Sequence, residues 1–262
     1  MKKKLTAALV LALCCVMLAA CALGEINVTK KDMNLNRSLD KNVNNILMIM
    51  QDGEKTDTLL IASVNGRTGR SVMTQIPVSI MVNVPEAGDM PISDVYALGG
   101  KKSKGLLVAR AVNSLLDLNV STYVAMDISR FPELIDEIGR LSTWLNEEEA
   151  AILGTWAGDN VLTSKNVMDY INIRLESDYE EKNRCYMVFM DLLKQGLRSA
   201  DASNLLGLGK KLLSSMDTNL NALAAVTMLS SFQGGDDRRE LFLYENMSAE
   251  EMRAAFHREV YE

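Results

Sequence analysis

Two aspartates, Asp52 and Asp57, are the residues of this chain whose type and spacing could do chemistry. They lie in a polar stretch between two apolar runs, Ile46–Met50 and Leu59–Val64. Short apolar runs bounded by Asp, Gly and Thr are typical of buried strands joined at the edge of a sheet. Two carboxylates held there can share a hard cation such as Mg²⁺, which can in turn hold phosphate. A solvated turn is the alternative, because Asp followed by Gly also favours a bend.

The composition excludes several other kinds of chemistry. The 262 residues include one histidine, His257, so neither a zinc site with several histidines nor a Ser-His-Asp triad is expected. Outside the N-terminal segment there is one cysteine, Cys185, whose apolar neighbours favour a buried structural thiol over a nucleophile. The formal charge of −6 is spread without a basic block, which argues against nucleic acid as a partner. Catalysis would therefore depend on carboxylates, hydroxyls, Lys, Arg or a metal held by oxygen.

The N-terminus has the pattern of an export signal. Met1–Lys4 is positively charged, Thr6–Leu18 is apolar, and small residues then precede Cys21. This resembles a lipobox, in which residues 1–20 are removed as a signal peptide and Cys21 is lipidated. An uncleaved anchor is also possible because the apolar run is nearly long enough to span a bilayer, and a plain secretory signal would need no cysteine. In each case the rest of the chain lies outside the cytoplasmic membrane, on its outer face where an anchor is present.

The elements that would position the two aspartates alternate between strands and helices. The segment Asn45–Val84 contains four predicted strands, with a tight hairpin turn at Asn65-Gly66 because this pair supplies positive φ angles. This alternation predicts an α/β domain with a central mixed β-sheet flanked by helices. The elements that follow are a loop at 85–100, an amphipathic helix at 103–117, an apolar strand at 122–126 and a helix at 129–139.

From residue 146 onward the spacing of apolar residues is mainly helical. Helices are predicted at 164–174, 178–198, 202–216, 219–232 and 249–260, with a short strand at 241–244. The expected organisation is a signal peptide (1–20), a polar tether (21–44), the α/β domain (45–200) and a helical C-terminal extension packed on it (201–262).

Several short motifs occur in an order that resembles one protein family. Thr56-Asp57-Thr58 follows the first predicted strand, and Gln75-Ile76-Pro77 ends the third. Tyr96-Ala-Leu-Gly-Gly100 precedes the amphipathic helix, and Tyr170-Ile-Asn-Ile-Arg174 lies at the end of the helix predicted at 164–174. No single motif is specific, but their order and spacing over residues 45–193 resemble the LytR-CpsA-Psr family of cell-envelope proteins.

The resemblance implies a membrane-anchored, extracytoplasmic protein that moves an anionic glycopolymer from a polyprenyl-pyrophosphate carrier to peptidoglycan. By this resemblance Asp52 and Asp57 would hold Mg²⁺ on the pyrophosphate, with Asp57 and Arg174 as catalytic residues. Lys55, Arg174 and Arg184 would bind the substrate. Such roles are chemically sound, because phosphoryl transfer requires cations that neutralise the charge developing on the phosphates.

The chain departs from the family pattern at positions where the family motifs have arginine. The family's Ile-Pro-Arg-Asp is Ile76-Pro-Val-Ser79 here, and Asn172 replaces the first arginine of Tyr-x-Arg-x-Arg. These changes favour a second hypothesis, a non-catalytic protein that binds a polyprenyl lipid, a wall polymer or an envelope protein. Arg174 and Arg184 have an alternative role as surface charges paired with the acids at 176–181. A transcription regulator is disfavoured, since the chain has an export signal and no basic DNA-reading element.

Overall fold

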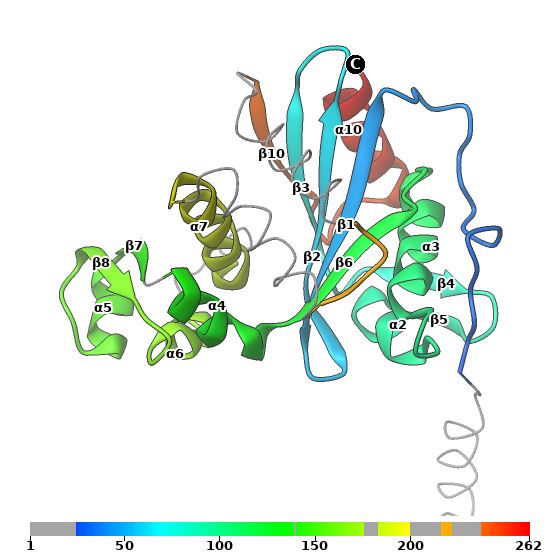
Figure 1. Cartoon of the computed structure of the whole chain (residues 1–262). Helices are drawn as coiled ribbons and strands as arrows, with labels where there is room; N and C mark the ends of the chain where they lie inside the picture. Colours follow the sequence, from blue (N-terminus) through cyan, green and yellow to red (C-terminus); the bar gives the residue numbers. More distant parts are fainter. Residues whose placement is uncertain (1–24, 139, 176–182, 200–215, 222–236) are drawn as a thin grey trace, which may run out of the picture.

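A computed structural model of the chain describes residues 25–138, 140–175, 183–199, 216–221 and 237–262 (Figure 1). At its centre is a mixed six-stranded sheet with the strand order β10-β3-β2-β1-β6-β9. The strands are β1 (Val43–Asp52), β2 (Lys55–Asn65), β3 (Ser71–Ile76), β6 (Thr122–Asp127), β9 (Asp217–Thr218) and β10 (Arg238–Phe242). Strands β1, β2 and β3 are antiparallel, whereas β6 runs parallel to β1 and β10 parallel to β3. The predicted α/β fold with a central mixed sheet is confirmed.

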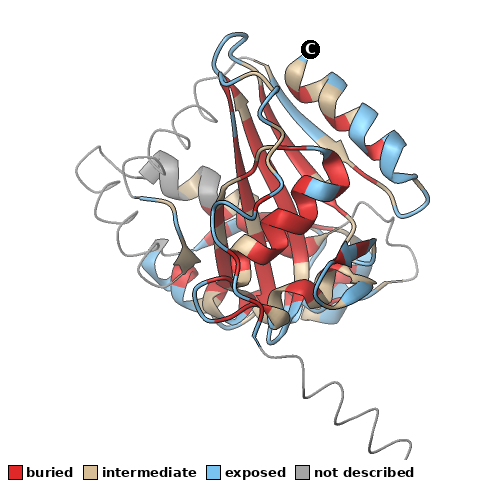
Figure 2. Cartoon of the chain, turned by 90° about the vertical axis from the view of Figure 1, so that its right-hand side faces the viewer, coloured by how far each residue is buried: buried red, intermediate tan, exposed pale blue. Residues whose placement is uncertain are grey.

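Helices cover both faces of this sheet and create two apolar cores. The helices are α2 (Ile92–Leu98), α3 (Lys104–Leu116), α4 (Phe131–Ile138), α5 (Glu147–Leu153), α6 (Val167–Ile171), α7 (Arg184–Ser199) and α10 (Ala249–Tyr261). The first core lies between the sheet and α2, α3 and α10, and the second between the sheet and α4, α6 and α7. Leu47 of β1 is buried in the first core and Met50 in the second, which explains why the central run Ile46–Met50 is apolar throughout. In Figure 2 the central strands are buried along most of their length.

Two small hairpins depart from the prediction. β4 (Met81–Val84) pairs with β5 (Gly88–Pro91) instead of joining the central sheet as its fourth strand. Gly88 has a φ of +88°, a conformation that glycine adopts easily and that helps the chain to turn back. β7 (Leu141–Leu145) and β8 (Gly158–Leu162) enclose α5, where the sequence predicts helix from residue 146.

Residues 25–42 pack against the domain, which corrects the predicted tether. Ile26 and Met33 are buried in the first core, and the Asn113 side chain donates a hydrogen bond of 2.7 Å to the Met33 carbonyl. This segment therefore belongs to the folded domain. The predicted signal peptide and Cys21 lie outside the described residues. Within the part of the chain that the structure describes, no helix has the length and hydrophobicity needed to cross a bilayer.

The C-terminal part supplies both edge strands of the central sheet, so it is more than the predicted helical extension. β9 pairs with β6, and β10 pairs with β3. The strand predicted at 241–244 is β10, which begins at Arg238, and the predicted final helix is confirmed as α10. The predicted helices at 202–216 and 219–232 fall almost entirely outside the described residues.

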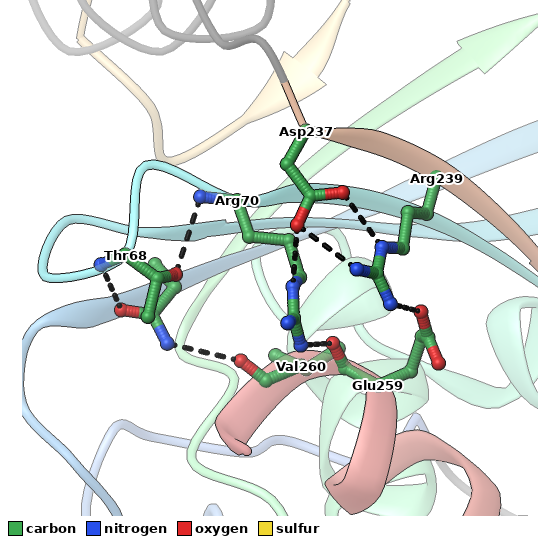
Figure 3. A network of polar contacts seen from close by, with 7 residues as sticks. Thr68, Arg70, Asp237, Arg239, Glu259 and Val260 are labelled. Atoms are coloured by element: carbon green, nitrogen blue, oxygen red, sulfur yellow. Dashed lines mark hydrogen bonds and ion pairs between the residues drawn. The ribbon is translucent and has the colours of Figure 1, made fainter.

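Charged side chains hold β10 and α10 against the turn between β2 and β3 (Figure 3). Arg70 donates from Nε to Asp237 Oδ2 at 2.9 Å and from Nη1 to the Glu259 carbonyl at 2.9 Å. Arg239 donates to Asp237 Oδ1 at 2.7 Å and to Glu259 Oε1 at 2.6 Å. Hydrogen bonds from Arg239 and Arg70 keep the pKa of Asp237 below its usual value. The network fixes the last helix to the edge of the sheet.

The segment Tyr96-Ala-Leu-Gly-Gly100 is closely packed, since a Cβ atom added at Gly99 or Gly100 would lie 2.5 Å from a neighbouring atom. The hydroxyls of Tyr96 and Tyr123 both donate to the Asp217 carboxylate, each at 3.0 Å. Burial and the charge of Asp217 raise the pKa of both tyrosines, so they remain donors. A Cβ atom added at Gly105 would lie 2.1 Å from the Tyr123 ring, so a larger residue there would displace α3 or the ring. These contacts give this motif a packing role, with no direct link to the two aspartates.

Candidate functional site

Both aspartates lie on strands rather than in a loop. β1 and β2 continue to the turn Gly53-Glu54, and Asp52 pairs with Lys55. Gly53 has a φ of +62°, which suits the first central position of a two-residue hairpin turn. The polar stretch is therefore the tip of a hairpin. It lies at the end of the sheet where β3, β6 and β10 also end, because these three strands run in the direction of β1.

A β-bulge in β2 sets the direction of Asp57. Thr56 and Thr58 pair with consecutive residues of β1, which leaves Asp57 between them as the extra residue. Thr58 Oγ1 donates a hydrogen bond of 2.8 Å to Asp57 Oδ2, so the two side chains lie on the same side of the strand. In a regular strand, neighbouring side chains point to opposite faces. The bulge therefore brings Asp57 to the side of the sheet that Thr58 faces.

A short hydrogen-bond relay connects Asp57 to the start of α7. Asn183 Nδ2 donates to Thr58 Oγ1 at 2.9 Å, and Thr58 in turn donates to Asp57. Asn183 Oδ1 also accepts a hydrogen bond of 2.9 Å from the Tyr186 backbone N–H, which caps the first turn of the helix. Sequence reasoning missed Asn183, because it lies within the helix predicted at 178–198, whereas α7 begins at Arg184. The relay holds the Asp57 carboxylate in place.

Arg174 lies close to the same site, on the loop after α6. Its Nη1 donates to the carbonyls of Ile171 and Ile173, at 2.8 and 2.9 Å, while the residue as a whole is exposed. Arg184, which directly follows Asn183 at the start of α7, donates to the same Ile173 carbonyl as Arg174, so the loop of Arg174 lies beside the start of α7. Asp57, through Thr58 and Asn183, and Arg174, through the Ile173 carbonyl, are thus both linked to the start of α7. Their catalytic role stays a prediction.

Arg184 is buried, so the alternative of a surface charge is wrong for this residue. Its side chain is 2% exposed and that of Glu149 is 1% exposed, and Arg184 Nε donates to Glu149 Oε1 at 2.8 Å. Arg184 Nη1 donates to the Ile173 carbonyl at 3.0 Å, the same carbonyl that Arg174 contacts. A contact between Arg184 and substrate stays a prediction. The contacts observed instead hold α5, α7 and the loop of Arg174 together.

Lys55 and Asp52 lie at the exposed tip of the hairpin. The Lys55 side chain is 76% exposed, and its Nζ lies 3.7 Å from Asp94 Oδ1 on α2. An exposed pair of this kind contributes little to stability, so Lys55 can exchange this partner for a phosphate at small cost.

The two aspartates fit a metal ion only when another ligand helps to hold it. Asp52 pairs with Lys55, and Asp57 follows Lys55 by two residues, so the aspartates are diagonal neighbours on adjacent strands. Diagonal neighbours have Cα atoms roughly 7–8 Å apart. Among the described residues, no group of three or more His, Cys, Asp or Glu could hold a metal ion. Mg²⁺ is commonly held by one or two carboxylates with phosphates and water, so the pair fits a cation shared with pyrophosphate.

Arg130 is a basic residue at this end of the sheet that sequence reasoning missed. The 3₁₀ turn Ile128–Arg130 directly follows β6, which runs parallel to β1 and ends beside it. Arg130 Nη2 lies 3.0 Å from Glu133, whereas its buried Nε has no hydrogen-bond partner among the described residues. Its signal in the sequence is a position just after an apolar strand, because parallel strands bring their carboxyl ends together.

A pocket of about 250 Å³ lies beside Asp57, between the ends of β3 and β10. We name it the β3–β10 pocket. Its polar lining comes from β2, β3, the start of α7 and the segment after β10, and its apolar lining from the ends of β3 and β10. The lining residues are Asp57, Thr58, Gln75, Ile76, Pro77, Val78, Asn183, Phe242, Leu243, Tyr244 and Glu245.

We expect the free energy of unfolding to fall in mildly alkaline solution because of the buried thiol of Cys185. Burial, together with the negative charge of Asp57, raises the pKa of its thiol, which therefore stays protonated in the folded chain. In the unfolded chain the thiol ionises near its usual pKa of about 8.5. The unfolded state then binds fewer protons, so the free energy of unfolding should fall above that pH, by at most about 1.4 kcal/mol per pH unit. Urea unfolding at pH 7.5 to 9.5 checks this, and Cys185→Ser should remove this part of the slope. An unchanged slope would contradict the assignment.

The sequence and the structure both match proteins of one family. The LytR_cpsA_psr family profile matches residues 21–249. The polyisoprenyl-teichoic acid–peptidoglycan teichoic acid transferase TagU of Bacillus subtilis is 25% identical over 179 residues, 65% of this chain and 56% of TagU. TagU of Oceanobacillus iheyensis is 25% identical over 155 residues, 55% of this chain and 48% of that protein. The chain thus spans about half the length of these curated relatives.

Solved structures agree with this match. TagT bound to LI-WTA superimposes with a TM-score of 0.68 at 14% identity, covering 90% of this chain and 99% of that one. The structure of TagT (YwtF) with bound octaprenyl pyrophosphate lipid gives a TM-score of 0.66 at 15% identity, with the same coverage of both chains. At these identities the solved structures establish the fold. With the profile match over most of its length, the chain belongs to the LytR_cpsA_psr family.

Proposed function

We propose that this chain transfers an anionic glycopolymer from a polyprenyl-pyrophosphate carrier to the cell wall, at the outer face of the cytoplasmic membrane. The main support is the link of Asp57, through Thr58 and Asn183, to the start of α7, where the loop of Arg174 also packs, so that segments far apart in the sequence meet at one end of the sheet. The relatives add to this, since TagU is named as a teichoic acid transferase and TagT binds a polyprenyl pyrophosphate.

The chemistry needs an anionic phosphate to be neutralised and an acceptor hydroxyl to be deprotonated. Mg²⁺ held by Asp52 and Asp57 would supply positive charge to the pyrophosphate, and Arg174 would add a guanidinium. The acceptor oxygen bonds to the phosphorus that carries the polymer, and the anhydride P–O bond breaks. Polyprenyl phosphate leaves with the electron pair. The acceptor proton passes to Asp57, which the Thr58 hydroxyl holds in position.

A lipid anchor at Cys21 would place this site where the carrier is. Ile26 is already packed into the domain, only five residues after Cys21. Five residues span at most roughly 18 Å when fully extended. A lipidated Cys21 would therefore hold the domain next to the bilayer, which suits a substrate whose polyprenyl chain stays in the membrane.

Binding of polyprenyl pyrophosphate to the full chain, with and without Mg²⁺, tests this function. We expect Mg²⁺ and the lipid to strengthen each other's binding, because the cation needs ligands from both protein and phosphate. Asp57→Ala should remove this mutual effect, whereas Asp94→Ala, which removes an acid of α2 that pairs with Lys55, should not. Binding that needs no metal and is unchanged in Asp57→Ala would contradict the proposal and favour a non-catalytic binding protein.

A further inference from the structure

We infer that Trp144, Ile152, Trp156 and Val161 form a patch that rests on the headgroup region of the bilayer. We name these four residues the tryptophan patch. The inference takes the lipid anchor at Cys21 from the proposed function and adds a second point of contact between the domain and the membrane, formed by the folded domain itself.

The patch gathers exposed apolar side chains in one small unit. Among the residues that the structure describes, five large apolar side chains are exposed, and four of them lie between Leu141 and Leu162. They include both tryptophans of the chain, which are 62% exposed at Trp144 and 71% exposed at Trp156. Tryptophan is highly buried on average, and exposed apolar residues that cluster mark interaction sites. This surface is therefore expected to have a partner.

The β7–β8 hairpin presents two of these side chains on its outer face. Its inner face packs against the second core. On the outer face Trp144 pairs with Asp159, and Ser142 pairs with Val161. Trp144 and Val161 are therefore diagonal neighbours on the same exposed face. Because the core holds the inner face in place, the outer face has a fixed direction.

Hydrogen bonds in the loop before β8 fix the backbone of Trp156. Asn160 Nδ2 donates to the Trp156 carbonyl at 2.7 Å, and Asn160 Oδ1 accepts from Thr155 Oγ1 at 2.9 Å. The Thr155 backbone N–H donates to the Ala150 carbonyl of α5 at 2.9 Å. The loop is thus ordered before any partner binds, which lowers the entropy cost of binding.

The patch lies beside the end of the sheet from which an anchor would extend. Ile26 bridges to Gly99, which follows α2, and Asp94 of α2 contacts Lys55 at the tip of the β1–β2 hairpin. In Figure 1 the β7–β8 hairpin and α5 lie beside the lower half of the sheet, where that tip and the first described residues also lie. A lipidated Cys21 would therefore bring the bilayer to this end of the domain.

The chemistry of the patch matches the headgroup region better than the hydrocarbon core. Tryptophan is enriched at membrane–water interfaces, where its ring contacts acyl chains while its N–H group stays near water. Asp159, directly opposite Trp144, is exposed on the same face. A carboxylate is costly in hydrocarbon, so Asp159 limits the contact to a shallow depth.

Tryptophan fluorescence of the full chain in phosphatidylcholine vesicles tests the inference, because both tryptophans of the chain belong to the patch. With lipids brominated near the headgroup end of the acyl chains, the emission should fall by roughly half or more, since interfacial rings reach this depth and bromine quenches them. Lipids brominated near the chain end should quench less. Trp144→Phe and Trp156→Phe, each measured alone, assign the quenching to the remaining ring, and both should keep it.

Arg67→Trp in a chain that also carries Trp144→Phe and Trp156→Phe is the matched control. Arg67 is 62% exposed and lies in the turn after β2, at the opposite end of the sheet from the β1–β2 tip. The ten residues of β1 separate the two ends by roughly 30 Å. Brominated lipids should leave the emission of this single ring unchanged.

Wild-type emission that brominated lipids leave unchanged, in a chain that floats with the vesicles, would overturn the inference. The patch would then be open to a protein partner or a second copy of the chain. Equal quenching of the ring at position 67 would overturn it too, because the contact would not be specific to the patch. Polymer transfer in the same vesicles is a separate measurement, so transfer with unchanged emission would refute the membrane contact and leave the proposed function intact.

Discussion

Arg184→Met will lower the free energy of unfolding by about 3–5 kcal/mol, because it leaves the buried Glu149 carboxylate without its counter-charge. The loss is large since both side chains are almost inaccessible to water, so solvent cannot replace the missing guanidinium. Urea or thermal unfolding of the purified chain measures it. The double variant Glu149→Gln with Arg184→Met should recover part of the loss, because it removes both charges together.

Arg67→Met is the matched control for this experiment. Arg67 also forms an ion pair, with Asp40 at 3.4 Å, but its side chain is 62% exposed. An exposed pair is worth roughly 0–1 kcal/mol, so this variant should be nearly neutral. If Arg184→Met were as mild as Arg67→Met and abolished lipid binding instead, Arg184 would be a substrate-binding residue and its structural role would be refuted.

Asp57→Asn will reduce the rate of polymer transfer on the order of 10²–10³-fold, the usual effect of losing one preorganised electrostatic group. The substitution keeps the shape of the side chain and an oxygen that can accept from Thr58, so the hydrogen-bond relay to Asn183 should persist. What is lost is the negative charge that would hold the cation and accept the proton. The unfolding free energy should change little, and initial rates measured with lipid-linked polymer test the prediction.

Glu54→Gln is the control for Asp57→Asn. Glu54 is exposed in the turn of the same hairpin, so its substitution removes one charge close to the site but none within it. It should retain a rate within a few-fold of wild type. Equal losses in the two variants would indicate a general electrostatic effect of the hairpin tip rather than a specific role for Asp57.

The strands at the centre of the sheet could be predicted from the sequence, because a strand buried on both faces contains an uninterrupted run of apolar residues. The central runs of β1 and β2, Ile46–Met50 and Leu59–Ala62, are apolar on both faces, and α3 has regular helical spacing between Ser103 and Asp117. The β7–β8 hairpin has no such apolar run, because β8 has the sequence Gly-Asp-Asn-Val-Leu and only one of its residues is buried. β9 has two residues, too few for any periodic pattern. Such short edge elements are defined by their partners, which sequence spacing does not show.

The turn after β2 shows how local chemistry can be correct in type and wrong in detail. The pair Asn65-Gly66 predicts positive φ angles at these residues, but the positive angle of +74° is at Gly69. Asn65 instead ends β2, and its side-chain oxygen accepts hydrogen bonds from the backbone N–H groups of Arg67 and Thr68, at 3.0 and 3.3 Å. The turn is therefore an Asn-stabilised loop rather than a two-residue hairpin.

The candidate site could be predicted only in part. Asp52, Asp57 and Arg174 are found from residue type and motif order. The bulge that aims Asp57, the Asn183 relay and the Glu149–Arg184 pair depend on contacts between residues as far as 125 positions apart. No local pattern encodes such contacts. Arg184 illustrates the consequence, since its type suggests a phosphate ligand while its burial beside Glu149 gives it a structural partner.

The most direct test of the proposed function is transfer itself. Purified full-length chain in detergent micelles, with Mg²⁺, polyprenyl-pyrophosphate-linked polymer and peptidoglycan, should attach polymer covalently to the peptidoglycan and release one polyprenyl phosphate for each chain attached. Asp57→Asn should do neither at a comparable rate. Tight binding of the carrier by the folded wild-type chain, without covalent attachment or release of polyprenyl phosphate, would contradict the enzymatic account.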